Sequence, residues 1–488
     1  MAERDFLKAR REKLDKLRRL GVEPYGRRYV RTHTCRDIHE RFDDLTGREV
    51  SVAGRVMALR HHGRSAFFDL ADQSGRVQAY VRRDNLGERD YEVFRLIDLG
   101  DIVGVRGKVF RTRTGEDTVE VRSLELLSKA LRPLPEKFHG LRDVDTRYRQ
   151  RYLDLIANPE TRRVFDLRSA AVRAIREFLD AEGFVEVETP VFSPLAGGAI
   201  ARPFVSYHNA LDMPVYLRIA TELYLKRLVV GGYEKVYELG RVFRNEGIST
   251  KHNPEYTLLE VYQAFADYTD MMDLTERLVS HVARVVLGTQ QVTFQGTTVD
   301  VTPPWPRVQM VEALERYSGI SLEDLRDDET ARRLARDRGL DVPENATWGM
   351  VLDELVGEFV EPHLTGPVFL IDYPVEVSPL AKRKPGSPRL VERFEAFICG
   401  REIANAFSEL NDPDDQRERF LAQAEERTRG HEEAHVMDED YLVALEHGLP
   451  PTGGLGIGVD RLVMILADKP SIRDVILFPL MRPLEEQG

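Results

Sequence analysis

Apolar residues recur at helical spacing at the start of the chain, from Leu7 to Leu20, and Gly21 follows them as a stop signal. The other faces of this predicted helix are basic, because residues 1–30 contain ten Lys or Arg and five Asp or Glu. A solvated amphipathic helix and a helix that contacts an RNA backbone both fit this pattern. We therefore expect an N-terminal helical segment over residues 1–47.

Short strands replace the helical pattern between residues 48 and 128. The strand-like runs cover residues 50–54, 67–72, 76–81, 103–109 and 119–121. Glycine-containing turns separate several of them, and a helical stretch is expected near residues 88–98. Five short strands of this kind predict a Greek-key barrel of the OB type. Such barrels bind single-stranded nucleic acid by stacking its bases on aromatic side chains.

Strands and helices alternate over the rest of the chain. Residues 129–150 have the prolines, glycine and dense charge of a linker. A long amphipathic helix follows and ends at Gly183. We predict an α+β fold, in which the barrel precedes a larger domain over residues 151–488. Within this domain, residues 266–365 are mostly helical and charged, and they predict an insertion or a peripheral layer.

Charge and cysteine content limit the possible partners. The net charge of −12 argues weakly against nucleic acid, but a local basic face can still bind RNA. No run approaches the roughly 18 apolar residues of a membrane span, and the N-terminus lacks an apolar signal core, so we expect a cytoplasmic protein without a membrane partner. Cys35 and Cys399 lie far apart and match no zinc pattern. We expect both to be buried free thiols.

A predicted hairpin carries charged residues where a core would need apolar ones. The alternating segments 236–246 and 255–263 flank a polar loop. Strand periodicity places Arg244 and Glu246 on one face of the first segment. One face of the second segment carries Tyr256, Leu258, Glu260 and Tyr262. Burying such charges requires partners or a ligand. An exposed hairpin at a sheet edge is the alternative.

Two further stretches are typical of a phosphate site. Glu395 and Glu402 flank a predicted turn and can face each other, and Mg²⁺ with phosphate oxygens would relieve their repulsion. A surface pair of acids is the alternative. The alternating glycines of 453–458 leave one strand face without side chains, so that a flat ligand can approach the backbone. We expect Asp460 to cap the helix that Arg461 opens.

Three stretches, in this order and spacing, resemble the signature motifs of class II aminoacyl-tRNA synthetases. Motif 1 resembles residues 183–190, which by physics alone form an ordinary helix-to-strand junction. Motif 2 resembles residues 243–246 with 252–260, and motif 3 resembles residues 454–461. Longer stretches resemble the lysine branch of the lysine, aspartate and asparagine subgroup, at residues 202–204, 222–228, 243–250, 407–412 and 472–479. The preceding barrel resembles the anticodon-binding domain of that subgroup.

The resemblance implies a class II catalytic domain built on an antiparallel sheet flanked by helices, and a homodimer built partly on residues 183–190. Its substrates would be L-lysine, ATP and tRNA(Lys), with Mg²⁺ as the cofactor. Arg244 is similar to the arginine that bridges the substrate carboxylate and the α-phosphate. Arg461 is similar to the arginine that covers adenine and reaches the γ-phosphate. Glu395 and Glu402 are similar to the magnesium ligands.

The same resemblance assigns the other binding positions. The ATP contacts would be Arg244, Glu246, His252, Asn253, Tyr256, Glu395 and Arg461, with Tyr256 in place of the usual Phe that stacks on adenine. The lysine pocket would hold Gly198, Glu222, Arg244, Glu260, Tyr262, Asn405 and Glu409. The anticodon contacts would be Arg60, Phe67 and Gln78. The chemistry agrees, because an ammonium group in a closed pocket needs a carboxylate and a hydroxyl acceptor, which Glu409 and Tyr262 supply.

The sequence departs from this resemblance near the pocket. Thr221 replaces a common Pro, and Ala404 and Ala406 stand where bacterial relatives often carry Gly. We expect these departures to shift the pocket slightly without changing its substrate. Strict alternation would place Glu402 on the opposite strand face from Asn405 and Glu409. A β-bulge between residues 402 and 409 is therefore required if all three serve one site.

Three alternatives remain open at this point. An aspartate or asparagine enzyme of the same subgroup would share the motifs. A lysine-ligating protein-modification enzyme would share the catalytic fold, but the barrel at 48–128 disfavours it. A non-catalytic RNA-binding relative is disfavoured by intact Arg244, Glu395, Glu402 and Arg461.

Overall fold

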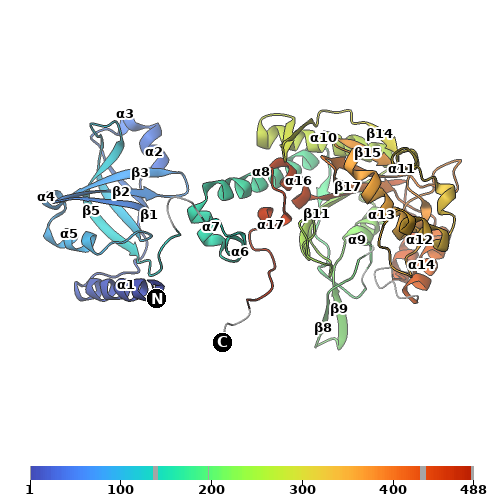
Figure 1. Ribbon diagram of the computed structural model, residues 1–488, viewed down its shortest axis with the longest axis horizontal. Coiled ribbons are helices and arrows are strands. Elements are labelled where there is room, and N and C mark those ends of the chain that lie inside the picture. Colours follow the sequence, from blue (N-terminus) through green and yellow to red (C-terminus); the bar gives the residue numbers. More distant parts are fainter. Residues whose placement is uncertain (1, 136–140, 196, 200, 429–435, 485–488) are drawn as a thin grey trace. The chain divides into compact units, whose positions relative to one another are not determined.

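A computed structural model describes residues 2–135, 141–195, 197–199, 201–428 and 436–484 (Figure 1). The chain divides into two compact units, Met1–Arg142 and Asp143–Gly488, and the sequence boundary between them falls within the predicted linker. We call them the N-terminal and the C-terminal unit. Among the described residues, no helix has the length and apolar character needed to cross a bilayer.

The N-terminal unit is built on a closed five-stranded barrel with the strand order β1-β2-β3-β5-β4. Its strands are β1 (Glu49–His62), β2 (Ser65–Ala71), β3 (Arg76–Arg82), β4 (Ile102–Arg111) and β5 (Asp117–Ser128). Its helices are α1 (Ala2–Arg19), α2 (Cys35–Glu40), α3 (Phe42–Leu45), α4 (Arg83–Leu86) and α5 (Glu88–Arg95). The predicted barrel, its five strands and the helical stretch near 88–98 are confirmed, and the strands are longer than their apolar runs suggested.

Helix α1 is anchored to the barrel rather than freely solvated. Leu14 and Leu17 are buried, as the leucine spacing predicts. Arg10 is also buried, and its guanidinium donates hydrogen bonds of 2.9 Å to the carbonyls of Ala130, Arg132 and Leu99. Part of the basic charge of this helix therefore serves packing within the unit.

An eight-stranded, mostly antiparallel sheet forms the centre of the C-terminal unit, with the order β14-β15-β16-β17-β18-β11-β10-β6. Its strands are β6 (Val185–Glu186), β10 (Lys235–Phe243), β11 (Glu255–Ala264), β14 (Arg307–Gln309), β15 (Val368–Ile371), β16 (Arg393–Ile398), β17 (Arg401–Ser408) and β18 (Thr452–Gly458). Smaller sheets use β7 (Phe192–Ser193), β8 (Val205–His208), β9 (Met213–Leu217), β12 (Gln291–Phe294) and β13 (Thr297–Asp300). Only the outermost pairs, β6–β10 and β14–β15, are parallel. The predicted fold class is confirmed.

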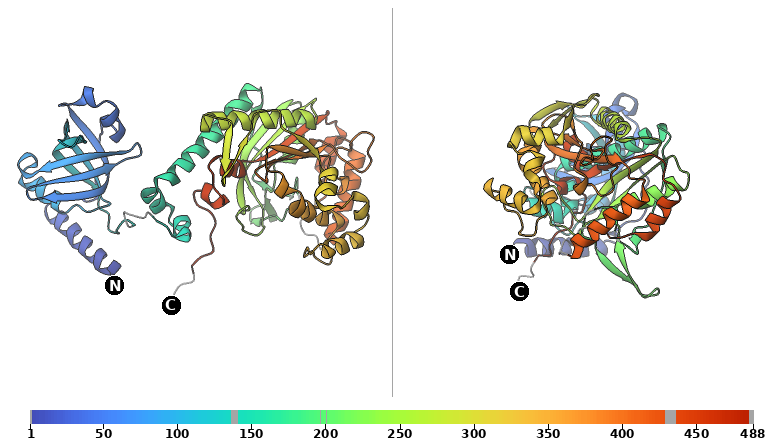
Figure 2. Two further views of the ribbon diagram at one scale, coloured as in Figure 1. Left: turned by 45° about the horizontal axis from the view of Figure 1, so that its top comes forward. Right: turned by 90° about the vertical axis from the view of Figure 1, so that its right-hand side faces the viewer.

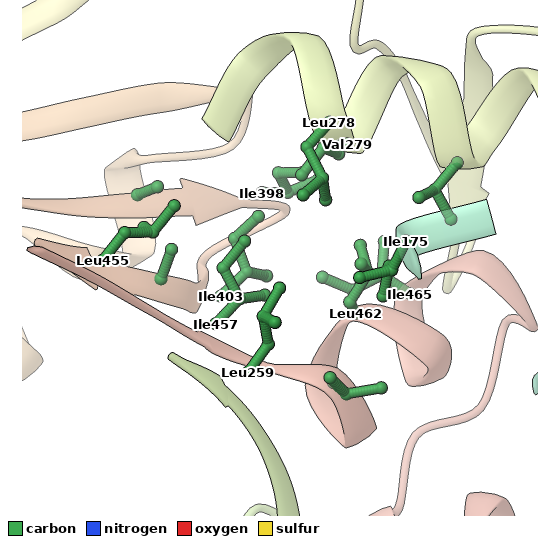
Figure 3. Close-up of a cluster of buried hydrophobic side chains, with 14 of the residues drawn as sticks. Ile175, Leu259, Leu278, Val279, Ile398, Ile403, Leu455, Ile457, Leu462 and Ile465 are labelled. Carbon is green, nitrogen blue, oxygen red and sulfur yellow. The ribbon is translucent and has the colours of Figure 1, made fainter. Parts of the chain in front are cut away.

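Helices pack on both faces of this sheet. The helices are α6 (Val144–Arg149), α7 (Arg151–Ala157), α8 (Pro159–Ala181), α9 (Glu222–Val230), α10 (Tyr268–Leu287), α11 (Met310–Ser318), α12 (Asp328–Asp337), α13 (Trp348–Phe359), α14 (Pro413–Thr428), α15 (Glu439–Glu446), α16 (Val459–Leu466) and α17 (Ile472–Val475). Helices α8 and α10 lie side by side (Figure 2). Side chains from them and from α16 pack on odd-numbered residues of β11 and β18, such as Leu259 and Ile457 (Figure 3). On the opposite face, α9, α14 and α15 pack beside Val236, Tyr262 and Ala264, and polar residues line the neighbouring part of the sheet.

Residues 266–365 do not form one peripheral layer. Helix α10 lies in the main core, where Leu278 and Val279 are buried against the sheet (Figure 3). A second apolar cluster contains residues of α11, α12 and α13, and strand β15 contributes Val368 and Leu370 to it. The charged composition of this region suggested a peripheral position, but its apolar residues recur at helical spacing and bury one helix face.

Candidate active site

A cavity of about 530 Å³ opens on the sheet face away from the main core. Even-numbered residues of β11 line it, while the odd-numbered Leu259 and Val261 face the core. All the residues predicted for the catalytic site line this cavity except Glu395. They are Gly198, Glu222, Arg244, Glu246, His252, Asn253, Tyr256, Glu260, Tyr262, Glu402, Asn405, Glu409 and Arg461.

The hairpin of β10 and β11 lies inside the sheet, because β18 and β6 flank it. The alternative of an exposed edge hairpin is therefore wrong. Strand β10 ends at Phe243, so that Arg244 and Glu246 follow the strand instead of extending it. The ladder continues by one bond, from the Arg244 N–H to the Pro254 carbonyl at 2.8 Å. This end of the hairpin directs Arg244 across the ring of Tyr256, 5.4 Å from its centroid.

A β-bulge in β17 brings Glu402 to the same cavity as Asn405 and Glu409. Ala396 pairs with Ala404, whereas the next residue, Phe397, pairs with Glu402. Ile403 is thus the extra residue, and the predicted bulge is confirmed. Without it, strict alternation would have turned Glu402 toward the helices.

One end of the cavity combines acids and arginines. Arg461 Nη1 donates to Glu402 Oε2 at 2.5 Å, and Arg461 Nη2 lies 3.4 Å from His252 Nε2. Glu395 lies behind the lining and accepts a 2.6 Å hydrogen bond from Arg393. Burial, followed by the like charge of Glu402, raises the pKa of Glu395 to about 7.

Oxygen donors at this end fit Mg²⁺, which uses one or two carboxylates and completes its octahedral shell with water and phosphate oxygens. Glu395 and Glu402 supply such a pair, and the repulsion that raises the pKa of Glu395 is what a cation between them would relieve. The described residues contain no group of three or more candidate ligands. A metal here would therefore depend on the phosphates of a nucleotide.

The opposite end of the cavity is built from buried carboxylates. Glu222, Glu260 and Glu409 are all buried and all line it. Burial, then the neighbouring Glu222, raises the pKa of Glu260 to about 7. Glu409 approaches β18 so closely that a methyl group on Gly454 would overlap its Oε1 atom. Neither oxygen of Glu409 has a hydrogen bond within the described residues, but Lys226 forms an ion pair with its Oε2 atom. Its Oε1 atom has no such partner among the described residues, and a buried carboxylate oxygen of this kind can accept from a cationic ligand.

Asn253 carries a further sign of a ligand, and Tyr256 is a buried neutral ring of the same cavity. Asn253 is buried and donates to the Glu255 carbonyl at 2.7 Å, but its Oδ1 atom accepts no hydrogen bond within the described structure. Burial raises the pKa of Tyr256 to about 12, so its phenol stays neutral at pH 7. Both line the cavity, and the guanidinium of Arg244 lies over the Tyr256 ring.

Three smaller predictions need correction. Asp460 does not cap helix α16, which begins at Val459 without a side-chain cap. Instead, Asp460 accepts hydrogen bonds of 2.6 Å from Arg168 and from the Thr257 N–H. Ala406 faces the main core and not the pocket, whereas Ala404 reaches the cavity. Both cysteines are free, but only Cys35 is buried and Cys399 is half-buried.

Two residues important to the cavity escaped prediction. Lys226 is fully buried and contacts Glu222 and Glu409. An acid and a lysine four residues apart on a helix normally form an exposed pair, so the spacing of Glu222 and Lys226 did not predict a buried one. Thr221 was noted only as a departure from a common Pro. Its N–H and hydroxyl both donate to Glu260 Oε2, at 3.1 and 2.7 Å.

Comparison with known protein families agrees with both units. The family described as tRNA synthetases class II (D, K and N) matches residues 143–482, and the OB-fold nucleic acid binding domain matches residues 50–127. The chain therefore belongs to the class II tRNA synthetases of this group.

Three relatives refine that position, and each is named lysine–tRNA ligase. The Moorella thermoacetica protein is 61% identical over 99% of both chains, and the Carboxydothermus hydrogenoformans protein is 59% identical over 98% of both. The Bacillus subtilis protein is 52% identical over 98% of this chain and 97% of its own. Within the class, this chain falls in the lysine–tRNA ligase family.

Proposed function

We propose that this chain activates L-lysine with ATP and transfers it to the 3′ end of tRNA(Lys) at the cavity described above. The observation that supports this most directly is the convergence of three chemistries in one cavity. Arg244 lines the same cavity as the Glu402–Arg461 pair, and the buried carboxylate of Glu409 also lines it. A substrate with a carboxylate, an ammonium group and a phosphate partner can engage all three together.

The first step forms the adenylate. The lysine carboxylate attacks the α-phosphorus of ATP in line, and pyrophosphate leaves. No protein base is required, because the carboxylate is already ionised at pH 7. Arg244 offsets the charge that develops on the α-phosphate, and alignment of the reactants supplies much of the rate. In the second step, the terminal ribose hydroxyl of tRNA attacks the adenylate and releases AMP.

The nucleotide would lie along the part of the cavity that the β10–β11 hairpin and Arg461 line. We assign Tyr256 and Arg461 to the two faces of adenine. Glu246, His252 and Asn253 are assigned to further ATP contacts, and the unsatisfied Oδ1 of Asn253 supports this. Glu395 and Glu402 would hold Mg²⁺, which supplies charge neutralisation to the phosphates when it is bound.

The amino acid would lie at the carboxylate end. We assign the ε-ammonium to Glu409 and Tyr262, and the α-amine to Glu222. Glu260, Asn405 and Gly198 would complete the pocket. An aspartate substrate would need a cation at its far end, where this cavity presents Glu409.

Pyrophosphate exchange with each of the twenty amino acids tests the proposal. Lysine alone is expected to support rapid exchange of labelled pyrophosphate into ATP. Exchange driven by aspartate or asparagine would instead indicate the other enzymes of the group. No exchange with any amino acid would indicate a non-catalytic relative.

A homodimer in the cytoplasm is part of the proposal. Strand β6, within residues 183–190, lies at the edge of the eight-stranded sheet, and its Val185 is half-exposed. Phe192 and Val205, on the nearby small sheet, are exposed apolar residues. The β8–β9 hairpin projects from its unit in both views (Figures 1 and 2). Apolar side chains on an edge strand favour a contact with a second copy.

The outer face of the barrel carries the residues assigned to the anticodon. Phe67 lies opposite Tyr80, with 4.6 Å between ring centroids. Gln78 accepts a 3.0 Å hydrogen bond from Thr118, which leaves its amide donors for a ligand. Arg60 donates to Asp69 at 2.9 Å. Together they offer a stacking surface beside polar groups that can read a base edge.

Changing Phe67 to Ala is expected to raise the KM for tRNA about tenfold or more, because stacking one base is worth roughly 1–3 kcal/mol. Lysine-dependent pyrophosphate exchange needs no tRNA and should stay unchanged. Aminoacylation and exchange assays on the same preparation measure both effects. Phe67→Tyr retains the ring and is the matched control. An equal loss in both assays would contradict the role.

Changing Thr221 to Val is expected to raise the KM for lysine about tenfold at pH 7, because it removes one hydrogen bond to a charged group. The pKa of Glu260 is raised to about 7 by burial, and the Thr221 hydroxyl opposes that rise. Without the hydroxyl, Glu260 takes up a proton at higher pH and no longer attracts an ammonium group. The defect should therefore shrink as pH rises above 7. Thr221→Ser keeps the hydroxyl and should behave like the parent protein. A defect of equal size at pH 6 and pH 9 would refute this explanation.

A further inference from the structure

Lys226 lies behind the amino-acid end of the cavity on helix α9, and its side chain is fully buried. Its Nζ atom is 2.5 Å from Glu222 Oε1 and forms an ion pair with Glu409 Oε2. The rings of Phe407 and Tyr441 lie 5.5 and 5.8 Å from the same ammonium group. Lys226 does not line the cavity, so it can act on a substrate only through the two carboxylates.

The buried charges at this end of the cavity do not balance. Three carboxylates are present, from Glu222, Glu260 and Glu409. Lys226 is the one ammonium group that pairs with any of them among the described residues, and Glu260 receives only the two hydrogen bonds of Thr221. The phenols of Tyr262 and Tyr441 are also buried here, and they are neutral. Two negative charges are thus left without a counter-ion, and burying such charges is costly.

Lysine carries two ammonium groups and one carboxylate. Its carboxylate is assigned to Arg244, so the ammonium groups are left to face the carboxylates. Their two positive charges equal the two negative charges that Lys226 leaves uncompensated. An amino acid with a single ammonium group would leave one buried carboxylate without a partner.

We propose that Lys226 is an internal counter-ion that sets the uncompensated charge of the pocket at minus two. The pocket therefore selects substrates by the number of their ammonium groups. This inference rests on the proposed lysine pocket and adds a positioning and specificity-determining residue to it. Lys226 also holds Oε2 of Glu409 from the α9 side. Oε1 then faces β18, where only a glycine at 454 leaves room for it.

The titration behaviour of the groups reflects the same imbalance of charge. Burial opposes a charge on Lys226, but Glu222 and Glu409 outweigh it, and the pKa of Lys226 lies above its ordinary value. Burial raises the pKa of Glu409, and Lys226 counteracts that rise. Burial likewise raises the pKa of Glu222 against the effect of Lys226. The empty pocket therefore tends to hold protons that a substrate with two ammonium groups displaces.

A charge-rescue experiment tests the proposal. Lys226→Met leaves three uncompensated carboxylates, and Glu222→Gln leaves one. Each single variant is expected to weaken lysine binding about 100-fold, as is typical when one partner of a buried charge pair is removed. The double variant restores a residual charge of two, and it should bind lysine at least tenfold more tightly than either single variant. Calorimetric titration with L-lysine measures this. Val229→Ala changes a buried residue of the same helix away from the cavity and controls for packing.

The possible results distinguish a failure of the proposed function from a failure of the role of Lys226. A parent protein that does not bind lysine would overturn the proposed function itself. A parent that binds lysine, with a double variant no better than the weaker single variant, would overturn the role of Lys226 alone. If Lys226→Met does not fold, Glu222→Gln decides by competition between lysine and norleucine, which has one ammonium group. The preference for lysine should fall at least tenfold, and an unchanged preference would contradict the charge count.

Discussion

Replacing Arg244 by alanine is expected to lower lysine-dependent pyrophosphate exchange by about 10²–10³-fold. Removal of one donor that is directed at charge developing in the transition state typically has an effect of this size. Arg244 follows β10 directly, lies over Tyr256 and lines the same cavity as Arg461 and Glu409. It is thus placed to contact both the attacking carboxylate and the α-phosphate. Because the negative charge on that phosphate grows in the transition state, kcat should fall more than the KM for lysine rises.

Arg244→Lys is the informative control for this prediction. It keeps the positive charge but loses the planar fork that can hold a carboxylate and a phosphate together, so an intermediate rate is expected. Steady-state exchange at saturating ATP and lysine measures both variants, and thermal unfolding shows whether they remain folded. Near-normal exchange by Arg244→Ala would remove Arg244 from the mechanism.

The sequence was sufficient to predict those parts of the fold that depend on periodicity. Alternating apolar residues predicted the five barrel strands and the central hairpin, because one face of each strand is buried. The bulge at Ile403 could be predicted without coordinates, since alternation alone could not bring Glu402 and Glu409 to one site. The positions of Glu402, Glu409 and Arg461 around one cavity were also expected, because the motifs that carry them are distinctive.

Features that depend on contacts between distant segments could not be predicted. Lys226 becomes a counter-ion only because Glu409, far away in the sequence, packs against helix α9. Asp460 has the residue type and position of a helix cap, but Arg168 of helix α8 binds it instead. Charge in the region 266–365 pointed to the surface, yet α10 is a core helix because its apolar stripe outweighs its charged face. In each case a local pattern allowed two environments, and tertiary packing selected one.

Replacing Gly454 by alanine is expected to raise the KM for lysine about 100-fold, because the loss of a buried contact between charged groups typically has an effect of this size. The added methyl group would overlap Glu409 Oε1 and lie 2.7 Å from Tyr262 Cε1. Both groups are assigned to the ε-ammonium, and neither can retreat easily, because Glu409 is held by Lys226 and Tyr262 is fixed in β11. Overpacking should also destabilise the fold by about 1–3 kcal/mol.

Gly456→Ala separates loss of the ammonium site from a general effect on strand β18. Gly456 lies two residues further along the same face of the strand, and a methyl group there would meet only the Asn405 carbonyl oxygen, at 3.7 Å. That is an ordinary contact, so the lysine KM of this variant should change far less than that of Gly454→Ala. Exchange kinetics over a range of lysine concentrations distinguish the two variants, and thermal unfolding reports their stability. Equal increases in KM for both would mean that the strand tolerates no side chain anywhere on this face. The close approach of Glu409 would then not be the reason for glycine at position 454.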